Sequence, residues 1–391
     1  MSEQPDEAPD QRVLDEGLAR LQALLGPEWT VRQEVAAEPL EAPRDLLGVG
    51  IRPDTVVSIQ DPSGSMYARV LVEAVTETSP ADLERRVLPK VGVLRSMLSS
   101  QGTAALVIAP WLSPRTREVL VNWGCGYLDL TGNVDFRLTR PGVVLRTQGA
   151  DRDPAPAVKA QRSIRGAAAG ALVRLLVDVR PPYRLKELAV ASGLSLAYVS
   201  RLIDTLDQQR LLRRDRKHGV VDVDWQGLLR ERAAEGGALL KNPSYQFIAP
   251  NGVDDILGRF PEARTHRNFA VTGSHAAETV APLAVGGELV LQQAADLGEP
   301  ARYRHELAHE LGLLRVTNPA RSKGANVRVV ESPSYVLDRA RVVDGVRYVG
   351  LSQVVLDCLS GPGRLPAAGE AVLAYMAGDE DDWRSPVLEL P

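Results

Sequence analysis

The chain has 391 residues, 44% of them hydrophobic and 25% charged, a composition typical of folded globular proteins that excludes disordered and fibrous classes. This length predicts two or three domains. The formal net charge is −4, and the two cysteines, Cys125 and Cys358, have no metal-ligand spacing. The acidic, polar N-terminus and the lack of a long uncharged run predict a cytoplasmic protein without a membrane span.

Residues 1–150 are expected to form a mixed α/β domain, because helical and strand-like apolar patterns alternate along them. The expected elements are helices near 13–25 and 80–100, strands at 55–61, 67–75 and 104–110, and a hairpin at 127–138. The stretch GADRDPAPA at 149–157 has no apolar period, so we expect a linker there.

Two carboxylates in this first domain suggest a metal site. Asp54 and Glu73 belong to successive apolar strands, an arrangement that resembles the PD-(D/E)xK nuclease fold. That resemblance implies a lysine two residues after the glutamate, where this chain has Val75, and Lys90 is the nearest candidate substitute. We therefore expect an inactive nuclease-like domain. A metal-dependent nuclease using Asp54 and Glu73 stays open, as does a strand-end Glu73 paired with an arginine.

Residues 158–235 are expected to form a winged helix-turn-helix. Three helices are predicted at 162–179, 184–192 and 195–209, with Gly193 in the turn between the last two. The residues predicted to pack inward are Ala189, Val199, Leu202, Ile203 and Leu206. An alternating segment around His218 and Gly219 predicts a two-stranded wing.

Charge distribution supports a nucleic-acid partner for this segment. Residues 159–232 hold 15 Lys and Arg against eight Asp and Glu, a net +7, which leaves −11 for the rest of the chain. The residues that we expect to contact double-stranded DNA are Arg184, Lys186, Ser195, Tyr198, Arg201, Arg213, Arg214, Arg216, Lys217 and His218. The alternative is a protein-interaction module whose arginines only solvate one face.

Residues 244–391 follow a Gly/Pro-containing junction and predict a C-terminal α/β regulatory or partner-binding domain. Three phrases, YLDLTGN at 127–133, FAVTGSHAAETVAP at 269–282 and YVGLSQVVLDCLSGPGR at 348–364, resemble the AbiEi-like group of antitoxins and transcriptional regulators. That resemblance implies a DNA-binding repressor of its own operon that opposes a nucleotidyltransferase-like toxin. The long first domain departs from it and favours a stand-alone regulator.

The segment RHELAHELG contains the zinc-peptidase motif H-E-x-x-H at His305, Glu306 and His309. The third-ligand position of the longer metzincin motif is Arg315, a cation. We expect both histidines to face solvent, opposite an apolar stripe. That stripe comprises Tyr303, Leu307, Leu311 and Leu314. A zinc metallopeptidase stays the alternative.

These observations together predict a multidomain α/β and α+β protein that acts as a DNA-binding transcriptional regulator. We expect no catalytic activity, no cofactor and no structural metal. The partner classes are double-stranded DNA and, for the last domain, a toxin, a polymerase or a small-molecule effector. Oligomeric state is left open, and two copies on an inverted repeat would be one arrangement.

Overall fold

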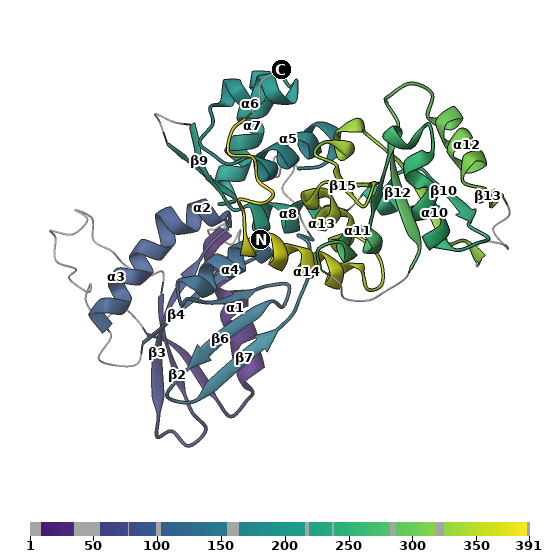
Figure 1. Cartoon of the computed structure of the whole chain (residues 1–391). Coiled ribbons are helices and arrows are strands. Elements are labelled where there is room, and N and C mark those ends of the chain that lie inside the picture. Colours follow the sequence, from purple (N-terminus) through teal and green to yellow (C-terminus); the bar gives the residue numbers. More distant parts are fainter. Residues whose placement is uncertain are drawn as a thin grey trace, which may run out of the picture. The chain divides into compact units, whose positions relative to one another are not determined.

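The computed structural model describes residues 9–34, 55–76, 78–98, 103–154, 164–215, 219–236, 238–281, 287–317 and 324–388 (Figure 1). The fold class is multidomain α/β: an N-terminal mixed seven-stranded sheet, a central helix-turn-helix with a β-hairpin wing, and a C-terminal mixed seven-stranded sheet. The chain divides into two compact units, residues 1–161 with 207–210, and residues 162–206 with 211–391. The finer boundaries expected at 150, 158, 235 and 244 stay predictions.

The first unit contains one sheet whose strands follow chain order from β1 to β7. The sheet is antiparallel from β1 to β3, parallel from β3 to β5, and antiparallel again to β7. Its strands are β1 (Thr30–Glu34), β2 (Thr55–Gln60), β3 (Tyr67–Ala74), β4 (Ala104–Ala109), β5 (Gly126–Asp129), β6 (Val134–Leu138) and β7 (Val143–Thr147). Its helices are α1 (Pro9–Leu25), α2 (Pro80–Asp82), the π-helical η1 (Leu83–Val87), α3 (Leu88–Leu98) and α4 (Pro114–Asn122).

Helices cover both faces of this sheet, which explains why its central strands are almost continuously apolar. Leu106 and Ile108 of β4 pack with α1, whereas the intervening Val107 packs with α3 and α4. The helix predicted at 80–100 is present, but a π-helical turn interrupts it. Ser79 caps its start by accepting a hydrogen bond from the backbone N–H of Asp82 at 3.2 Å.

The second unit begins with the winged helix and continues into the C-terminal sheet. The winged helix comprises α5 (Gly166–Asp178), α6 (Leu185–Ser192), α7 (Leu196–Gln208), β8 (Leu212–Asp215), β9 (Gly219–Val223) and α8 (Trp225–Ala234). The predicted order of three helices and a hairpin is confirmed. Val220 of β9 also exchanges two backbone hydrogen bonds of 3.1 Å with Tyr183, which anchors the wing to the segment before α6.

The C-terminal sheet has the order β13-β10-β14-β12-β11-β16-β15. Its strands are β10 (Ser244–Ile248), β11 (Phe269–Thr272), β12 (Leu289–Ala294), β13 (Leu314–Arg315), β14 (Val327–Ser332), β15 (Arg341–Val343) and β16 (Val346–Tyr348). Its helices are α9 (Ala238–Lys241), α10 (Val253–Arg259), η3 (Phe260–Glu262), η4 (His266–Asn268), α11 (Ser274–Glu278), α12 (Pro300–Glu310), η6 (Ser334–Leu337), α13 (Leu351–Leu359) and α14 (Leu365–Gly378). Helices α13 and α14 are adjacent (Figure 1). Both contribute buried residues to the hydrophobic core.

One hydrophobic core runs through the winged helix and the C-terminal sheet, from Ile164 to Met376. A buried arginine crosses the same junction. Arg174 of α5 is 3% exposed, and its Nη1 donates to Gln353 Oε1 of α13 at 2.8 Å. Its Nη2 donates to the carbonyl of Asp338 at 3.0 Å, and its Nε to Asp178 Oδ2 at 3.2 Å. Each partner compensates the guanidinium for lost hydration.

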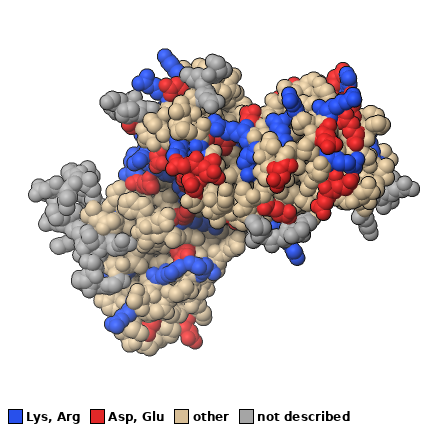
Figure 2. Space-filling view, viewed as in Figure 1, with Lys and Arg blue, Asp and Glu red and all other residues tan. Residues whose placement is uncertain are grey.

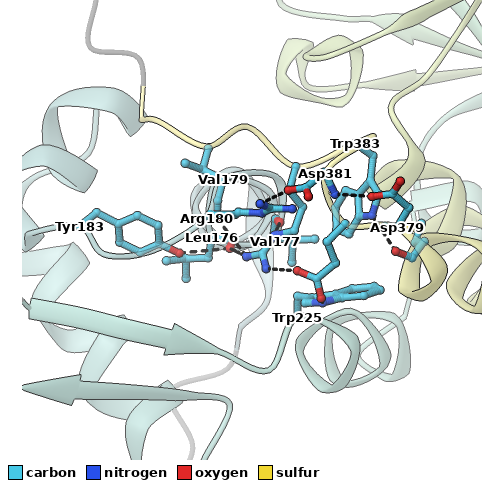
Figure 3. Close-up of polar contacts among 12 residues, drawn as sticks. Leu176, Val177, Val179, Arg180, Tyr183, Trp225, Asp379, Asp381 and Trp383 are labelled. Carbon is cyan, nitrogen blue, oxygen red and sulfur yellow. Dashed lines mark hydrogen bonds and ion pairs between the residues drawn. The ribbon is translucent and has the colours of Figure 1, made fainter.

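The C-terminal segment, residues 379–388, also packs against α5 (Figure 3). Arg384, 7% exposed, donates from Nε to the carbonyl of Val177 at 2.9 Å and from Nη2 to that of Val179 at 3.0 Å. These carbonyls lie at the end of α5, where the last turn of a helix leaves its acceptors without intrahelical partners. The segment therefore caps the first helix of the winged helix.

Aromatic side chains strengthen this attachment. Trp225 of α8 and Trp383 pack edge to face with ring centroids 4.9 Å apart, and Trp225 Nε1 donates to Glu380 Oε1 at 2.7 Å (Figure 3). Tyr183 donates its hydroxyl to the carbonyl of Leu176 at 3.1 Å, and burial raises the pKa of that phenol. The hydroxyl is therefore a permanent donor at physiological pH.

Candidate nucleic-acid interface

Local capping contacts and a glycine, all visible in the sequence, fix where α6 begins and ends and where α7 begins. The backbone N–H of Arg184 donates to Glu187 Oε2 at 2.8 Å, which fixes the start of α6. Gly193 ends α6 with φ of 66°, a left-handed conformation that glycine adopts without steric cost. Ser195 begins α7 by accepting the N–H of Tyr198 at its Oγ, at 3.3 Å. The turn therefore sets the angle between the two helices.

The inward face of α7 is the predicted one. Val199 and Ile203 have no exposed surface, and Ala189 of α6 is buried in the same hydrophobic core. Leu202 and Leu206 complete the same stripe and are also buried. Because this stripe fixes the rotation of α7 about its axis, the opposite face of the helix must point to solvent.

The outward face carries most of the predicted DNA contacts on these two helices. Ser195, Arg201, Arg184 and Lys186 are exposed, and the last three side chains form no ion pair within the described part of the chain. Tyr198 differs from the prediction: it is half-buried and packs partly against the core. Its side chain therefore packs against the core that positions α7, and it is less accessible to DNA than predicted.

The two described arginines of the wing, Arg213 and Arg214, differ in exposure and in ion pairing. Arg213 is exposed, with Nη2 3.8 Å from Asp222 Oδ2 on the opposite strand. Arg214 is half-buried and paired with Asp204 of α7, so its charge is partly neutralised. The predicted Arg216, Lys217 and His218 lie outside the described residues. Figure 2 shows Lys and Arg side chains at the outer edge of the winged helix, interspersed with acidic ones.

The candidate nuclease residues come together only in part. Glu73 lies on the α3 face of β3 and is 2% exposed, with Lys90 Nζ 3.4 Å from its Oε2. Lys90 thus points to the carboxylate of Glu73. The helical position of Lys90 in the sequence did not predict this direction. Asp54 lies outside the described residues. Among the residues described, no group of three His, Cys, Asp or Glu side chains is arranged to hold a metal.

The H-E-x-x-H segment forms α12, with His305 and His309 exposed, as expected. Glu306 accepts from Arg302 Nε at 2.8 Å. Leu314 does not belong to the apolar stripe, because α12 ends at Glu310 and Leu314 begins β13 with 57% of its surface exposed.

Arg304, which sequence reasoning did not single out, is buried beside that stripe. Its Nη1 donates to Gln293 Oε1 at 2.9 Å, and its guanidinium lies 3.4 Å from the ring centroid of Tyr245. It also pairs with Glu331 of β14. Structural contacts thus account for the buried side of α12.

A domain with three helices and a two-stranded wing, in which α7 buries one face and exposes the other, belongs to the winged helix-turn-helix class that docks on DNA. Residues 169–216 match the family model of the IclR helix-turn-helix domain. No curated protein and no solved structure matches the chain. The matched region is confined to the winged helix, so the AbiEi-like and PD-(D/E)xK resemblances receive no support from these comparisons. Within the described residues, no helix is long and apolar enough to cross a membrane.

Proposed function

We propose that the chain is a transcriptional regulator that binds double-stranded DNA by inserting α7 into the major groove. The observation that carries this proposal is that the two faces of α7 differ. One face is buried in the hydrophobic core, and the other exposes Ser195 and Arg201 to solvent. The IclR-type match over 169–216 supports the same function independently of burial.

Each exposed residue has a distinct role in this proposal. Arg201 reads a guanine, since a guanidinium can donate to O6 and N7 at once. Ser195 donates to a phosphate or base edge from the start of α7. Arg184, Lys186 and Arg213 neutralise phosphates on either side of the groove, which sets affinity and salt dependence. Arg214 acts differently, because its pair with Asp204 holds the wing to α7.

The experiment is genome-wide mapping of bound sites, followed by measurement of DNA affinity on the strongest site. Arg201→Ala should weaken binding by about 1–3 kcal/mol and relax selectivity at one base pair, because a bidentate base contact is lost. Lys186→Ala should weaken binding to all sequences alike and lower the salt slope by about one unit.

Arg264→Ala is the matched control, since Arg264 lies in the C-terminal domain with 93% of its side chain exposed. It should leave both the affinity and the salt slope unchanged. Unaltered affinity in Arg201→Ala and Lys186→Ala, with the folded state intact, would refute this interface and favour a protein-interaction module.

We further propose that the regulator acts alone, without a toxin partner, and that its first domain is a non-catalytic scaffold. The sequence supports the scaffold role, because Val75 stands where the nuclease pattern places a lysine two residues after Glu73 and cannot stabilise a scissile phosphate. Magnesium-dependent nicking of the bound DNA that is lost in Glu73→Ala would overturn the scaffold role. Glu118→Ala, an exposed carboxylate on α4, is the control for that assay.

A further inference from the structure

A pocket of about 360 Å³ opens where the winged helix meets the C-terminal domain. We call it the junction pocket. It is lined from the winged helix by the start of α5 and the end of α8, and from the C-terminal domain by α9, η6 and α13. A larger pocket of about 560 Å³ between α11, β12 and α14 has no lining residue from the winged helix. The junction pocket is therefore the better placed of the two to influence DNA binding.

Three cationic side chains line the junction pocket, and each is held in place by a neighbour. Arg232 donates to the carbonyls of Ile164 at 2.6 Å and Gly166 at 3.2 Å. Lys241 donates to the carbonyl of Glu235 at 2.7 Å, which occupies one of the three donors on its ammonium group. Arg165, the third, pairs with the Glu235 carboxylate. Fixed cations of this kind favour an anionic ligand, because little side-chain entropy is lost on binding.

The inner end of the pocket is apolar and amide-lined. Leu356 and Val336 provide apolar surface, and Gln353 and Asn242 provide amides. The single acid at this end, Asp357, is fully buried, and burial raises the pKa of its carboxyl. At the cationic rim, the carboxylate of Glu235 is paired with Arg165. The volume suits a compact organic molecule.

Gln353 connects this pocket to the winged helix. Its Oε1 accepts from Arg174 of α5 at 2.8 Å, and its Nε2 donates to Asp357 Oδ1 at 2.9 Å. Asp357 in turn accepts from Thr272 at 2.6 Å and from Gln292 at 2.9 Å, both in the sheet. A ligand that contacts Gln353 therefore acts on the hydrogen bonds that join α5 to the C-terminal domain.

We propose that the junction pocket binds a small organic anion, a carboxylate or a phosphate ester, and that occupancy changes the affinity of the winged helix for DNA. The second half of this proposal rests on the proposed function. Coupling of this type has to come from contacts that differ between two arrangements of α5 and α13. The Arg174–Gln353 bond is the contact that a bound ligand would alter.

The experiment uses the full chain and three probes: inorganic phosphate, citrate and adenosine monophosphate, each compared with chloride at equal ionic strength. Thermal unfolding reports binding. The affinity for the mapped DNA site reports coupling, with an expected change of about 5-fold or more. A rise in melting temperature with phosphate alone identifies the anion as sufficient, whereas a rise only with citrate or the nucleotide requires the organic part.

Two variants test the location of the site. Lys241→Ala removes a rim cation, and Ala167→Leu fills the mouth from an exposed position in the first turn of α5. Both should abolish the thermal shift and the change in DNA affinity. Arg264→Ala, which removes a charge elsewhere in the C-terminal domain, should retain both.

The proposal is overturned when no probe shifts the melting temperature, or when the shift survives in Lys241→Ala and Ala167→Leu, since that result marks a general salt effect. A thermal shift that the variants abolish, in a protein that binds no DNA, supports the anion site and refutes the proposed function. A shift without any change in DNA affinity refutes the coupling.

Discussion

In the YLDLTGN segment, the side chain of Asp129 accepts five hydrogen bonds. It has no exposed surface. Its Oδ1 accepts from the backbone N–H of Thr131 at 2.9 Å and of Asn133 at 3.0 Å, and its Oδ2 accepts from the N–H of Leu112 at 3.1 Å. Asn133, also fully buried, holds Gly149 through its Oδ1 at 2.9 Å. These contacts give the YLDLTGN phrase a structural role in shaping the β5–β6 turn.

We therefore expect Asp129→Ala to lower the free energy of unfolding of the first unit by about 3 kcal/mol or more, because several buried donors lose their acceptor together. Urea unfolding followed by circular dichroism measures this loss. Asp151→Ala, an exposed aspartate near the end of the same domain, should change the stability by no more than about 0.5 kcal/mol. Similar losses in the two variants would contradict this account of Asp129.

Asp357 predicts a pH dependence of stability. Burial raises its pKa in the folded state above the reference value of 3.8, so the folded protein keeps this proton to higher pH than the unfolded chain does. The resulting stabilisation is fully present below the unfolded pKa and is lost as pH rises through the folded pKa. Asp357→Asn cannot titrate. Its stability relative to wild type should therefore increase as pH rises above the reference pKa of 3.8.

Urea unfolding of wild type and Asp357→Asn at a series of pH values measures the difference in their free energies of unfolding. Taking this difference removes the contributions of the carboxyls that the two proteins share. A difference that stays constant with pH would show that Asp357 has the same protonation behaviour in the folded and unfolded chain.

At the scale of the elements, the C-terminal segment, residues 379–388, caps α5 through the side chain of Arg384. Arg384 supplies donors to the last carbonyls of α5, a position where a cation also interacts favourably with the helix dipole. We expect Arg384→Ala to destabilise the second unit by about 2–4 kcal/mol, because charged hydrogen bonds to buried carbonyls are lost. Thermal unfolding measures this loss, with Arg264→Ala as control. Arg384→Lys should recover only part of it, since one ammonium cannot reproduce the planar fork.

Elements whose pattern is local were predictable from the sequence, and contacts between distant segments were not. The inward face of α7 follows from helical spacing within a dozen residues, and Gly193 marks the turn by itself. The burial of Arg174 depends on Gln353 and Asp338, which lie far along the chain. No periodicity encodes such a pairing. For the same reason the sequence placed Tyr198 and Arg214 on the DNA-facing surface, whereas packing and the pair with Asp204 partly withdraw them.

At the scale of the whole molecule, the shared core predicts how the chain responds to truncation. Because one hydrophobic core extends from α5 to α14, the winged helix and the C-terminal domain should unfold together. A fragment of residues 162–391 is expected to fold and to show one cooperative thermal transition. A fragment of residues 162–236 should be much less stable, since it leaves Arg174 without Gln353 and Asp338, and leaves the end of α5 without Arg384.

Circular dichroism during heating measures both fragments, and amide hydrogen exchange reports whether α5 is protected in each. Comparable melting temperatures and equal protection of α5 would mean that the winged helix is an independent domain. That result would also remove the physical basis for coupling through the junction pocket, because an anion held there affects DNA affinity only when α5 depends on α13 for its position.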